Sequence, residues 1–442
     1  MIFLKKILPL LLSILLLTCP IMLACAEPID QLITNGRIAL QQKNKSAAIT
    51  ALTNALEQNP NNPEALFYMG VLHYYAHNNS TALSYLQRCY EQHPKHAQYL
   101  NAYVTVANHM GQFDCARDLI ESNFGAEPQE TTLRTKLLPL YIRSMDWYYA
   151  SKLCRTSDLW WYNEDISNQT VLLDLSSQWN GHGDVMQIIR YARHLHTAGA
   201  RVSVYVRPEM VALLSLCPYI EDVIATTHHK PALEKEYTLT TDRLTLIMHD
   251  TLHSPSQDIP YLYADQSRCE QWKKKLAFYP TLKVGICFQS SPMRDYFSNT
   301  IIPGPRSMQP EEIAPLLTVP GISFFSLHMG NDSAVKKLCR YPTFHVFDEL
   351  DTDYGPFMDT AAVIKQLDLV ITVDTSIAHL AGALGVPVWT MVPYAGDFRW
   401  FASRSDSPWY PTMTLFRQAK QGEWSDVILR VKEALQSYLF KK

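Results

Sequence analysis

The pattern of apolar and polar positions changes twice along the chain. An apolar run covers residues 7–24, directly after two lysines. Between about residues 29 and 160, apolar and small residues recur with a helical period, and from Val171 onward short buried-strand patterns alternate with amphipathic helical ones. The pattern predicts a leader, a region of helical repeats and an α/β region.

The helical region repeats itself every 34 residues, because several columns share one register: Gly36 and Gly70; Ala48, Ala82, Ala116 and Ala150; Leu52, Leu86 and Ile120; Pro60, Pro94 and Pro128. Small residues let two antiparallel helices approach, the large apolar residue packs on the same face, and the proline ends the second helix. The region 29–160 resembles tetratricopeptide repeats, which form an α-solenoid. Such a solenoid binds a protein partner on its concave surface or positions a neighbouring domain, and the sequence leaves both open.

The α/β region starts with a strand at 171–175, a glycine turn at 180–184, a helix at 185–198 and a strand at 200–206. The pattern restarts with further strands at 284–288, 323–327, 344–346, 369–373 and 388–392. Strand–turn–helix–strand is the unit of a parallel sheet. We therefore expect two doubly wound halves, at 165–275 and 276–435, connected near residues 272–278. Their ligands should bind at the carboxyl ends of the strands.

The first loop at such a strand end contains Gly181, Gly183 and Asp184. The glycines allow close approach of the backbone, and Asp184 falls at the start of the predicted helix. A carboxylate there is favoured by the helix dipole. Two roles compete evenly on local grounds: Asp184 caps the helix, or it removes a proton from an acceptor hydroxyl.

The second loop follows the strand at 369–373. Asp374 and Thr375 end that strand and open a helix, whose free N–H groups form an anion site. Thr375 and Ser376 add hydroxyl donors suited to a pyrophosphate. His379 lies one helical turn beyond Thr375, on the same face.

Composition narrows the classes of function. Hydrophobic residues make up 47% of the 442 residues and charged residues 18%, so a large core is available. The net charge of -3 gives no electrostatic argument for a nucleic-acid partner. The nine cysteines show no ligand spacing, so we expect no metal site.

Residues 1–26 have the plan of a secretory signal peptide: Lys5 and Lys6, an apolar centre, and the small-x-small site Ala24-Cys25-Ala26. A retained membrane anchor is the main alternative, and a lipoprotein signal or a misassigned start the others. The first two place the rest of the chain in the periplasm or envelope, whereas a misassigned start leaves it in the cytoplasm.

Several separated motifs resemble glycosyltransferase family 9, the heptosyltransferase-like enzymes, and its branch that carries tetratricopeptide repeats. The motifs are the segment 368–389, Asp397-Phe398-Arg399-Trp400, the stretches 407–411 and 415–418, and Gly181-x-Gly183-Asp184 with Arg190-Tyr191. The similarity spans about residues 165–435, with the repeats upstream in the expected order.

This resemblance implies a GT-B fold, α + α/β overall, and a transferase that needs no metal and no cofactor besides its nucleotide-sugar donor substrate. By the same resemblance, Asp184 is the general base and Arg306 balances the leaving-group charge. Asp374, Thr375, Ser376 and His379 hold the donor, and Gly181 and Gly183 form the first loop. The acceptor is a glycan, a lipid-linked glycan or a protein.

One segment departs from that branch. After the strand at 284–288 the branch has a Trp-x-Gly-Asn-Pro loop, whereas this chain has Cys287-Phe288-Gln289-Ser290-Ser291-Pro292 and a longer run, 293–305. An export signal also conflicts with a cytoplasmic nucleotide sugar. The alternative function is therefore an exported or envelope scaffold, in which the repeats bind partners and the GT-B unit is degenerate.

Overall fold

The computed structural model describes residues 27–127, 131–144, 153, 165–177, 181–231, 235–238, 258–329 and 333–440. The expected leader, residues 1–26, lies outside these ranges, as do Pro128 and Ala150 of the repeat columns. In the described ranges no helix is both long and apolar enough to cross a membrane. The chain divides into two compact units. One, the repeat unit, contains the described residues up to Val106 together with Asp295–Asn299; the other, the α/β unit, contains the rest. The predicted domain boundaries stay predictions.

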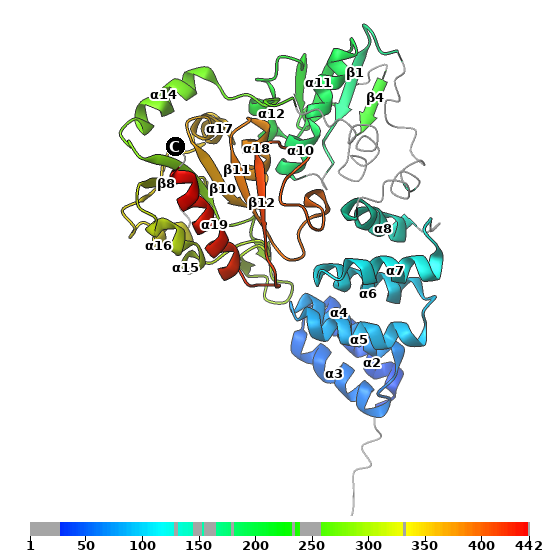
Figure 1. Cartoon of the computed structure of the whole chain (residues 1–442). Coiled ribbons are helices and arrows are strands. Elements are labelled where there is room, and N and C mark those ends of the chain that lie inside the picture. Colours follow the sequence, from blue (N-terminus) through cyan, green and yellow to red (C-terminus); the bar gives the residue numbers. More distant parts are fainter. Residues whose placement is uncertain are drawn as a thin grey trace, which may run out of the picture. The chain divides into compact units, whose positions relative to one another are not determined.

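The first four described helices of the N-terminal region pack as two antiparallel pairs, and three more helices of this region follow them along the chain (Figure 1). They are α2 (Ile29–Gln41), α3 (Lys45–Gln58), α4 (Pro63–Tyr75), α5 (Asn79–Gln92), α6 (Ala97–His109), α7 (Phe113–Phe124) and α8 (Thr131–Arg143). Asn44, Asn62 and Asn78 cap α3, α4 and α5, because each side chain accepts a hydrogen bond from the backbone three residues on.

The predicted repeat columns meet inside these pairs. A methyl group on Gly70 would lie 2.5 Å from Cγ of Leu86, and one on Gly36 would lie 2.6 Å from Cγ of Leu52. The small column therefore touches the large column of the same repeat, and any side chain at the glycine would force the helices apart. Ala48 and Ala82 are fully buried. The helical-repeat prediction is confirmed.

After α7 and α8, which also belong to it, the α/β unit contains a parallel sheet of order β3-β2-β1-β4. Its strands are β1 (Thr170–Asp174), β2 (Arg201–Val206), β3 (Asp222–Ala225) and β4 (Lys235–Thr238), and its helices are α10 (His182–Ile188), α11 (Arg190–Thr197) and α12 (Pro208–Leu214). The prediction of one helix from 185 to 198 is wrong, because the helical segment is interrupted at Ile189 and forms the two helices α10 and α11. Helix α14 (Gln266–Leu276) covers the first part of the segment 272–278, which stays the predicted connection between the halves.

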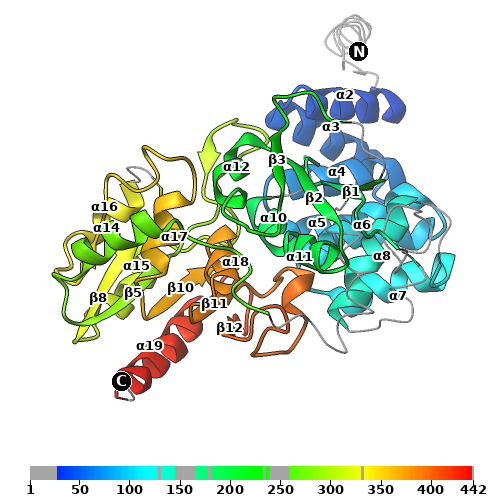
Figure 2. The same cartoon turned by 90° about the horizontal axis from the view of Figure 1, so that it is seen from above.

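A second parallel sheet has the order β12-β11-β10-β5-β8-β9 (Figure 2). Its strands are β5 (Leu282–Cys287), β8 (Ile322–Ser326), β9 (Phe344–His345), β10 (Leu369–Val373), β11 (Val388–Val392) and β12 (Met413–Arg417). Numbered by their order in the chain, the strands lie in the order 6-5-4-1-2-3, which is the order of a Rossmann sheet. Successive strands are added outward from β5 on one side and from β10 on the other, so the strand order reverses between these two parallel strands. Two sheets of this kind after a helical repeat region confirm the predicted α + α/β class.

Helices cover the second sheet: α14, α15 (Pro310–Ile313), α16 (Ser333–Leu338), α17 (Met358–Ile364), α18 (Ser376–Ala383) and α19 (Ser425–Leu439), with the 3-10 turns η2 (Ala314–Thr318) and η3 (Phe398–Trp400). Val284 and Phe324 of the sheet share a core with Val431 of α19. A short antiparallel hairpin, β6 (Met293–Arg294) with β7 (Ile301–Ile302), projects from the segment after β5.

Candidate functional site

The candidate site lies beside β5 and β10, where the strand order of the second sheet reverses. β10 pairs in parallel with β5, and Thr372 lies opposite Cys287 at their carboxyl ends. Asp374 follows β10 and is 2% exposed. Thr375 has an extended backbone and caps α18, because its hydroxyl accepts a hydrogen bond from the N–H of Ile377 at 3.3 Å. In sheets of this kind, ligands bind at the carboxyl ends of the two strands on either side of the reversal.

Arg306 pairs with Asp374 at this position. Its Nη1 lies 3.1 Å from Oδ2 of Asp374, and its side chain is 41% exposed. A carboxylate as buried as Asp374 needs such a partner, because an uncompensated buried charge is strongly unfavourable. The structure thus brings together Arg306, Asp374 and Thr375, three of the residues expected at the donor site.

Asp184 is held by two donors on opposite sides. Its Oδ2 accepts from the backbone N–H of Gly181 at 2.5 Å, which closes a capping interaction at the start of α10. Its Oδ1 lies 2.6 Å from Nη2 of Arg399 in η3. The two competing roles are therefore not exclusive, since Asp184 caps α10 with one oxygen and faces the second half of the α/β unit with the other.

His379 is a buried centre of hydrogen bonding. Its Nδ1 lies 2.8 Å from the hydroxyl of Tyr410, and its Nε2 lies 3.4 Å from Nη1 of Arg399. Burial, followed by the charges of Arg399, Arg190 and Arg306, holds the pKa of His379 well below its ordinary value. Because a guanidinium only donates, Nε2 is the acceptor and Nδ1–H donates to Tyr410.

The two loops approach each other closely. A methyl group on Gly183 would lie 2.7 Å from Cδ2 of His379 and 3.4 Å from Cα of Ser376. Helices α10 and α18 pack together at this point. Gly183 is therefore required for contact between the first loop and the helix that follows Asp374. All predicted site residues belong to this region or border it.

Sequence reasoning assigned no role to the residues that join these parts. Arg399 is 9% exposed, and it also lies 2.9 Å from Asp397. Arg190 of α11 is 3% exposed; its Nη2 donates to the hydroxyl of Tyr261 at 2.9 Å and its Nη1 to the carbonyl of Trp409 at 3.0 Å. The signal that was available is an arginine inside an otherwise apolar stretch, which has to find buried partners.

The described residues contain no group of three or more His, Cys, Asp or Glu side chains placed to hold a metal ion. The charged groups of the site are instead two arginine–carboxylate pairs. This arrangement can hold an anion near Arg306 and the start of α18, with the Asp184 carboxylate on the facing loop.

No family model matches the chain. Protein FlbA from Caulobacter vibrioides is 26% identical over 190 residues, which cover 40% of this chain and 29% of FlbA. The match therefore spans less than a third of that relative. Similar solved structures include a glycosyl transferase family 9 protein from Veillonella parvula, with 11% identity, a TM-score of 0.44, and coverage of 63% of this chain and 99% of that chain. They also include a thermophilic TPR protein from Thermus thermophilus, with 14% identity, a TM-score of 0.25, and coverage of 29% and 72%.

The chain is thus similar to a family 9 glycosyl transferase structure and to a TPR protein. With these TM-scores, the architecture is established by the observed helix pairs and sheet orders rather than by the likenesses. The fold and site define a protein with helical repeats and an α/β unit of two Rossmann-like sheets.

Proposed function

We propose that the protein is a glycosyltransferase that moves a sugar from a nucleotide-sugar donor to a hydroxyl of a glycan, lipid-linked or protein acceptor. One observation carries the proposal: at the carboxyl ends of β5 and β10, Arg306 forms an ion pair with buried Asp374 while 41% of its side chain stays exposed. A guanidinium held in this way is ready for an anionic ligand. The sequence motifs that resemble family 9 are in keeping with this.

On the donor side, the diphosphate would lie at the start of α18. The hydroxyls of Thr375 and Ser376 and the free N–H groups of that helix supply donors, and Arg306 supplies positive charge. When the glycosidic bond to the diphosphate breaks, negative charge grows on the leaving oxygen. A preorganised guanidinium stabilises that charge more than it stabilises the ground state, which lowers the barrier.

On the acceptor side, Asp184 would take the proton of the attacking hydroxyl. Each of its oxygens already accepts one hydrogen bond, from Gly181 or from Arg399. A carboxylate offers about four acceptor positions, so one more hydroxyl can donate to it. The two existing donors would fix the direction in which Asp184 meets the acceptor.

The second candidate is an exported or envelope scaffold with an unreactive α/β unit, whose repeats bind a protein partner. The observation that favours it is the same pair of contacts, because Arg399 already lies 2.6 Å from the proposed base. The two candidates have the same fold and differ in whether the protein transfers a sugar.

Calorimetric titration of the full chain with ADP, GDP and UDP tests the proposal. We expect saturable binding of one nucleotide that weakens by about tenfold or more in Thr375→Val and Asp374→Asn, which each remove a donor-site contact. Thr414→Val is the matched control, because Thr414 is exposed on β12. A folded protein that binds none of the three contradicts the proposal. If the protein binds a nucleotide but neither transfers nor releases the sugar of the corresponding nucleotide sugar, the scaffold is supported.

A further inference from the structure

The segment that departs from the family branch contains the β6–β7 hairpin, and the tip of this hairpin belongs to the repeat unit. The residues directly before the tip, up to Arg294, and those after it, from Thr300 onward, are part of the α/β unit, whereas Asp295–Asn299, here called the tip, cluster with the repeats. Asp295 shapes the tip, because its Oδ1 accepts from the N–H groups of Phe297 at 3.1 Å and Ser298 at 2.7 Å. The tip is thus a folded element with its own hydrogen bonds.

The tip is held by the turns of the first two repeats. The ring of Tyr296 stacks on Tyr75 with centroids 4.1 Å apart and planes 9° from parallel. Its hydroxyl donates to the carbonyl of Leu40 at 3.1 Å. His77 Nε2 lies 3.5 Å from Oδ2 of Asp295. Tyr296 therefore makes both an aromatic and a polar contact to the repeats.

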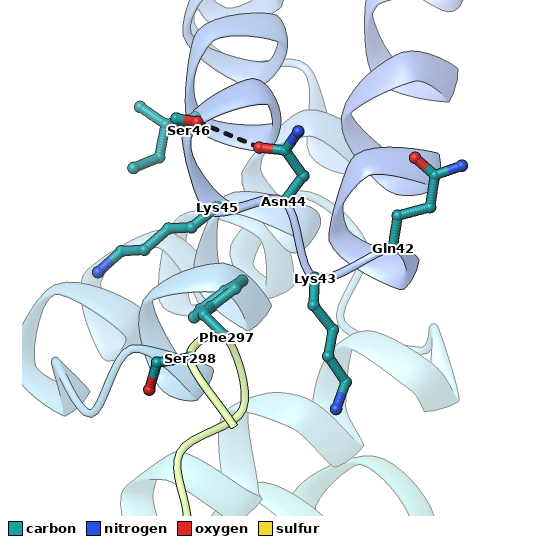
Figure 3. Close-up of a pocket in the computed structure, with 8 residues that line it drawn as sticks. Gln42, Lys43, Asn44, Lys45, Ser46, Phe297 and Ser298 are labelled. Carbon is teal, nitrogen blue, oxygen red and sulfur yellow. Dashed lines mark hydrogen bonds between the residues drawn. The ribbon is translucent and has the colours of Figure 1, made fainter. Parts of the chain in front are cut away.

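Two lysines of the α2–α3 turn lie over the aromatic rings of the tip. Lys43 Nζ is 5.2 Å from the ring centre of Tyr296, and Lys45 Nζ is 5.7 Å from that of Phe297. Figure 3 shows Phe297 and Ser298 beside this turn, where they line one pocket together with residues 42–46. Distances of this size are in the range of cation–π attraction.

The backbone at these turns is strained where it meets the tip. Lys43 has φ 60° and His77 has φ 59°, and the two occupy the same position of successive repeats, 34 residues apart. The next equivalent position is Gly111, with φ 73°, where a methyl group would lie 2.5 Å from the ring of Tyr394. Glycine adopts this conformation without strain, while other residues lose stability in it. The two turns that keep a side chain in spite of the strain are the two whose side chains contact the tip.

The base of the same hairpin is tied to the candidate site. The N–H of Ser290 donates to Oγ of Ser307 at 3.0 Å, and the N–H of Met308 donates to the carbonyl of Phe288 at 2.8 Å. Arg306, which pairs with Asp374, lies directly before Ser307. The covalent chain and this closed base thus connect the tip to the segment that contains Arg306.

We propose that the α2–α3 and α4–α5 turns form a seat for the tip and that, through the hairpin, the seat positions Arg306. Lys43, His77 and Tyr296 are then positioning residues for the candidate donor site. The seat itself stands on the contacts above, while its effect on nucleotide affinity rests on the proposed function.

Hydrogen–deuterium exchange on the full chain tests the seat without any ligand. In Tyr296→Ala we expect the amides of residues 296–299 to exchange about tenfold faster or more, because a ring stack and a hydrogen bond are lost. Amides of residues 306–308 should also exchange faster. Tyr296→Phe, which keeps the stack, should fall between Tyr296→Ala and the unchanged protein. Phe278→Ala is the control, because this ring is 86% exposed and lies outside the hairpin.

Lys43→Gly and His77→Gly separate the seat from a purely structural role. If these side chains serve only the turns, glycine relieves the strain, and the exchange of the tip stays unchanged. If they hold the tip, its exchange accelerates although the unfolding temperature does not fall. Unchanged exchange of the tip in both variants and in Tyr296→Ala overturns the seat.

A double-mutant cycle with the nucleotide that the protein binds tests the link to Arg306. We expect Tyr296→Ala to weaken binding about threefold to tenfold, as for one weakened charged contact. The double variant Tyr296→Ala, Arg306→Ala should bind no more weakly than Arg306→Ala alone. Independent losses that multiply contradict the link. If the unchanged protein binds no nucleotide, the proposed function fails, and the link is then decided by the exchange of residues 306–308.

Discussion

Two arginine–carboxylate pairs lie at the candidate site, and they differ in how much water reaches the arginine. In the pair of Arg399 and Asp184, the side chains are 11% and 14% exposed. In the pair of Arg306 and Asp374, the arginine side chain is 41% exposed and the carboxylate 2%. Arg399 also contacts His379 and Asp397. The first pair is thus embedded in a network of protein groups, while the second leaves its arginine open to a ligand.

The difference in exposure between Arg399 and Arg306 predicts different consequences when either arginine is removed. Removal of Arg399 leaves the carboxylates of Asp184 and Asp397 without their partner. When Arg306 is removed, Asp374 still has the positive charge of Arg399 nearby, and the lost guanidinium is partly exposed. We expect Arg399 to matter mainly for folding and Arg306 mainly for binding.

The largest effect is expected for Arg399→Met. It leaves Asp184 and Asp397 without their buried partner, so the free energy of unfolding should fall by about 3–5 kcal/mol. Urea unfolding of the full chain measures this change. Arg404→Met is the control, because Arg404 pairs with Asp406, which is 65% exposed, and should lose less than about 1 kcal/mol. Equal losses in the two variants would remove the distinction between the pairs.

Arg306→Ala should have the opposite profile. We expect the affinity for the bound nucleotide to fall about 10- to 100-fold, as for a lost charged hydrogen bond. The unfolding free energy should fall by less than in Arg399→Met, because the Arg306 side chain is 41% exposed and Asp374 keeps the nearby charge of Arg399. Arg306→Lys keeps the charge but loses the planar set of guanidinium donors, so it should recover part of the affinity. Calorimetry and urea unfolding on the same samples measure both quantities. A loss of stability as large as that of Arg399→Met would show that Arg306 is structural.

Gly183→Ala tests the close contact between the two loops. The added methyl group would lie 2.7 Å from His379, whose ring is buried and cannot move away freely. We expect a loss of about 1–3 kcal/mol, as for overpacking of a core. Gly181→Ala is the matched control: Gly181 has φ -68°, and a methyl group there meets only the side chain of Asp184. Thermal unfolding that lowers the midpoint equally in both variants contradicts this account.

The sequence predicted the repeats and most strands because those signals are local. The columns at Gly36 and Gly70 meet Leu52 and Leu86 within one repeat, and the strand at 369–373 is an unbroken apolar run. The break at Ile189 was not predictable, since the apolar period continues across it. Strand β12 was not predicted, because it combines buried, half-buried and exposed positions instead of forming an unbroken apolar run.

The candidate site was predicted only in part for the same reason. Asp184 and the Asp374–Thr375 pair each follow a recognisable strand, so their position at a sheet edge could be inferred. Arg399 reaches Asp184 across more than two hundred residues of chain. The contact between Tyr296 and Tyr75 is equally distant in sequence. No local pattern indicates which of the arginines or tyrosines makes such a contact.

The smallest effect concerns pH and again separates the two arginines. The pKa of His379 is held well below its ordinary value by burial first and then by Arg399, while Arg306 is the last of the contributing charges. The unfolded chain therefore binds a proton near pH 6.5 that the folded protein does not bind. This contribution to stability is complete above about pH 6.5 and decreases as the pH falls below it, by at most about 1.4 kcal/mol per pH unit.

Urea unfolding between about pH 5.5 and 7.5 measures this dependence. Burial also lowers the pKa of His182, so the slope of the unchanged protein is a sum over several histidines. The difference in slope between the unchanged protein and His379→Gln isolates the contribution of His379. His182→Gln provides the comparison, since after burial the charges that shift the pKa of His182 are those of Arg207 and Glu209. Arg306→Ala should leave the slope nearly intact, because its charge adds less to the shift than burial and Arg399 do. If His379→Gln has the same slope as the unchanged protein, His379 is not the buried neutral partner of Arg399. The network that distinguishes the first pair from the second would then lack its central member.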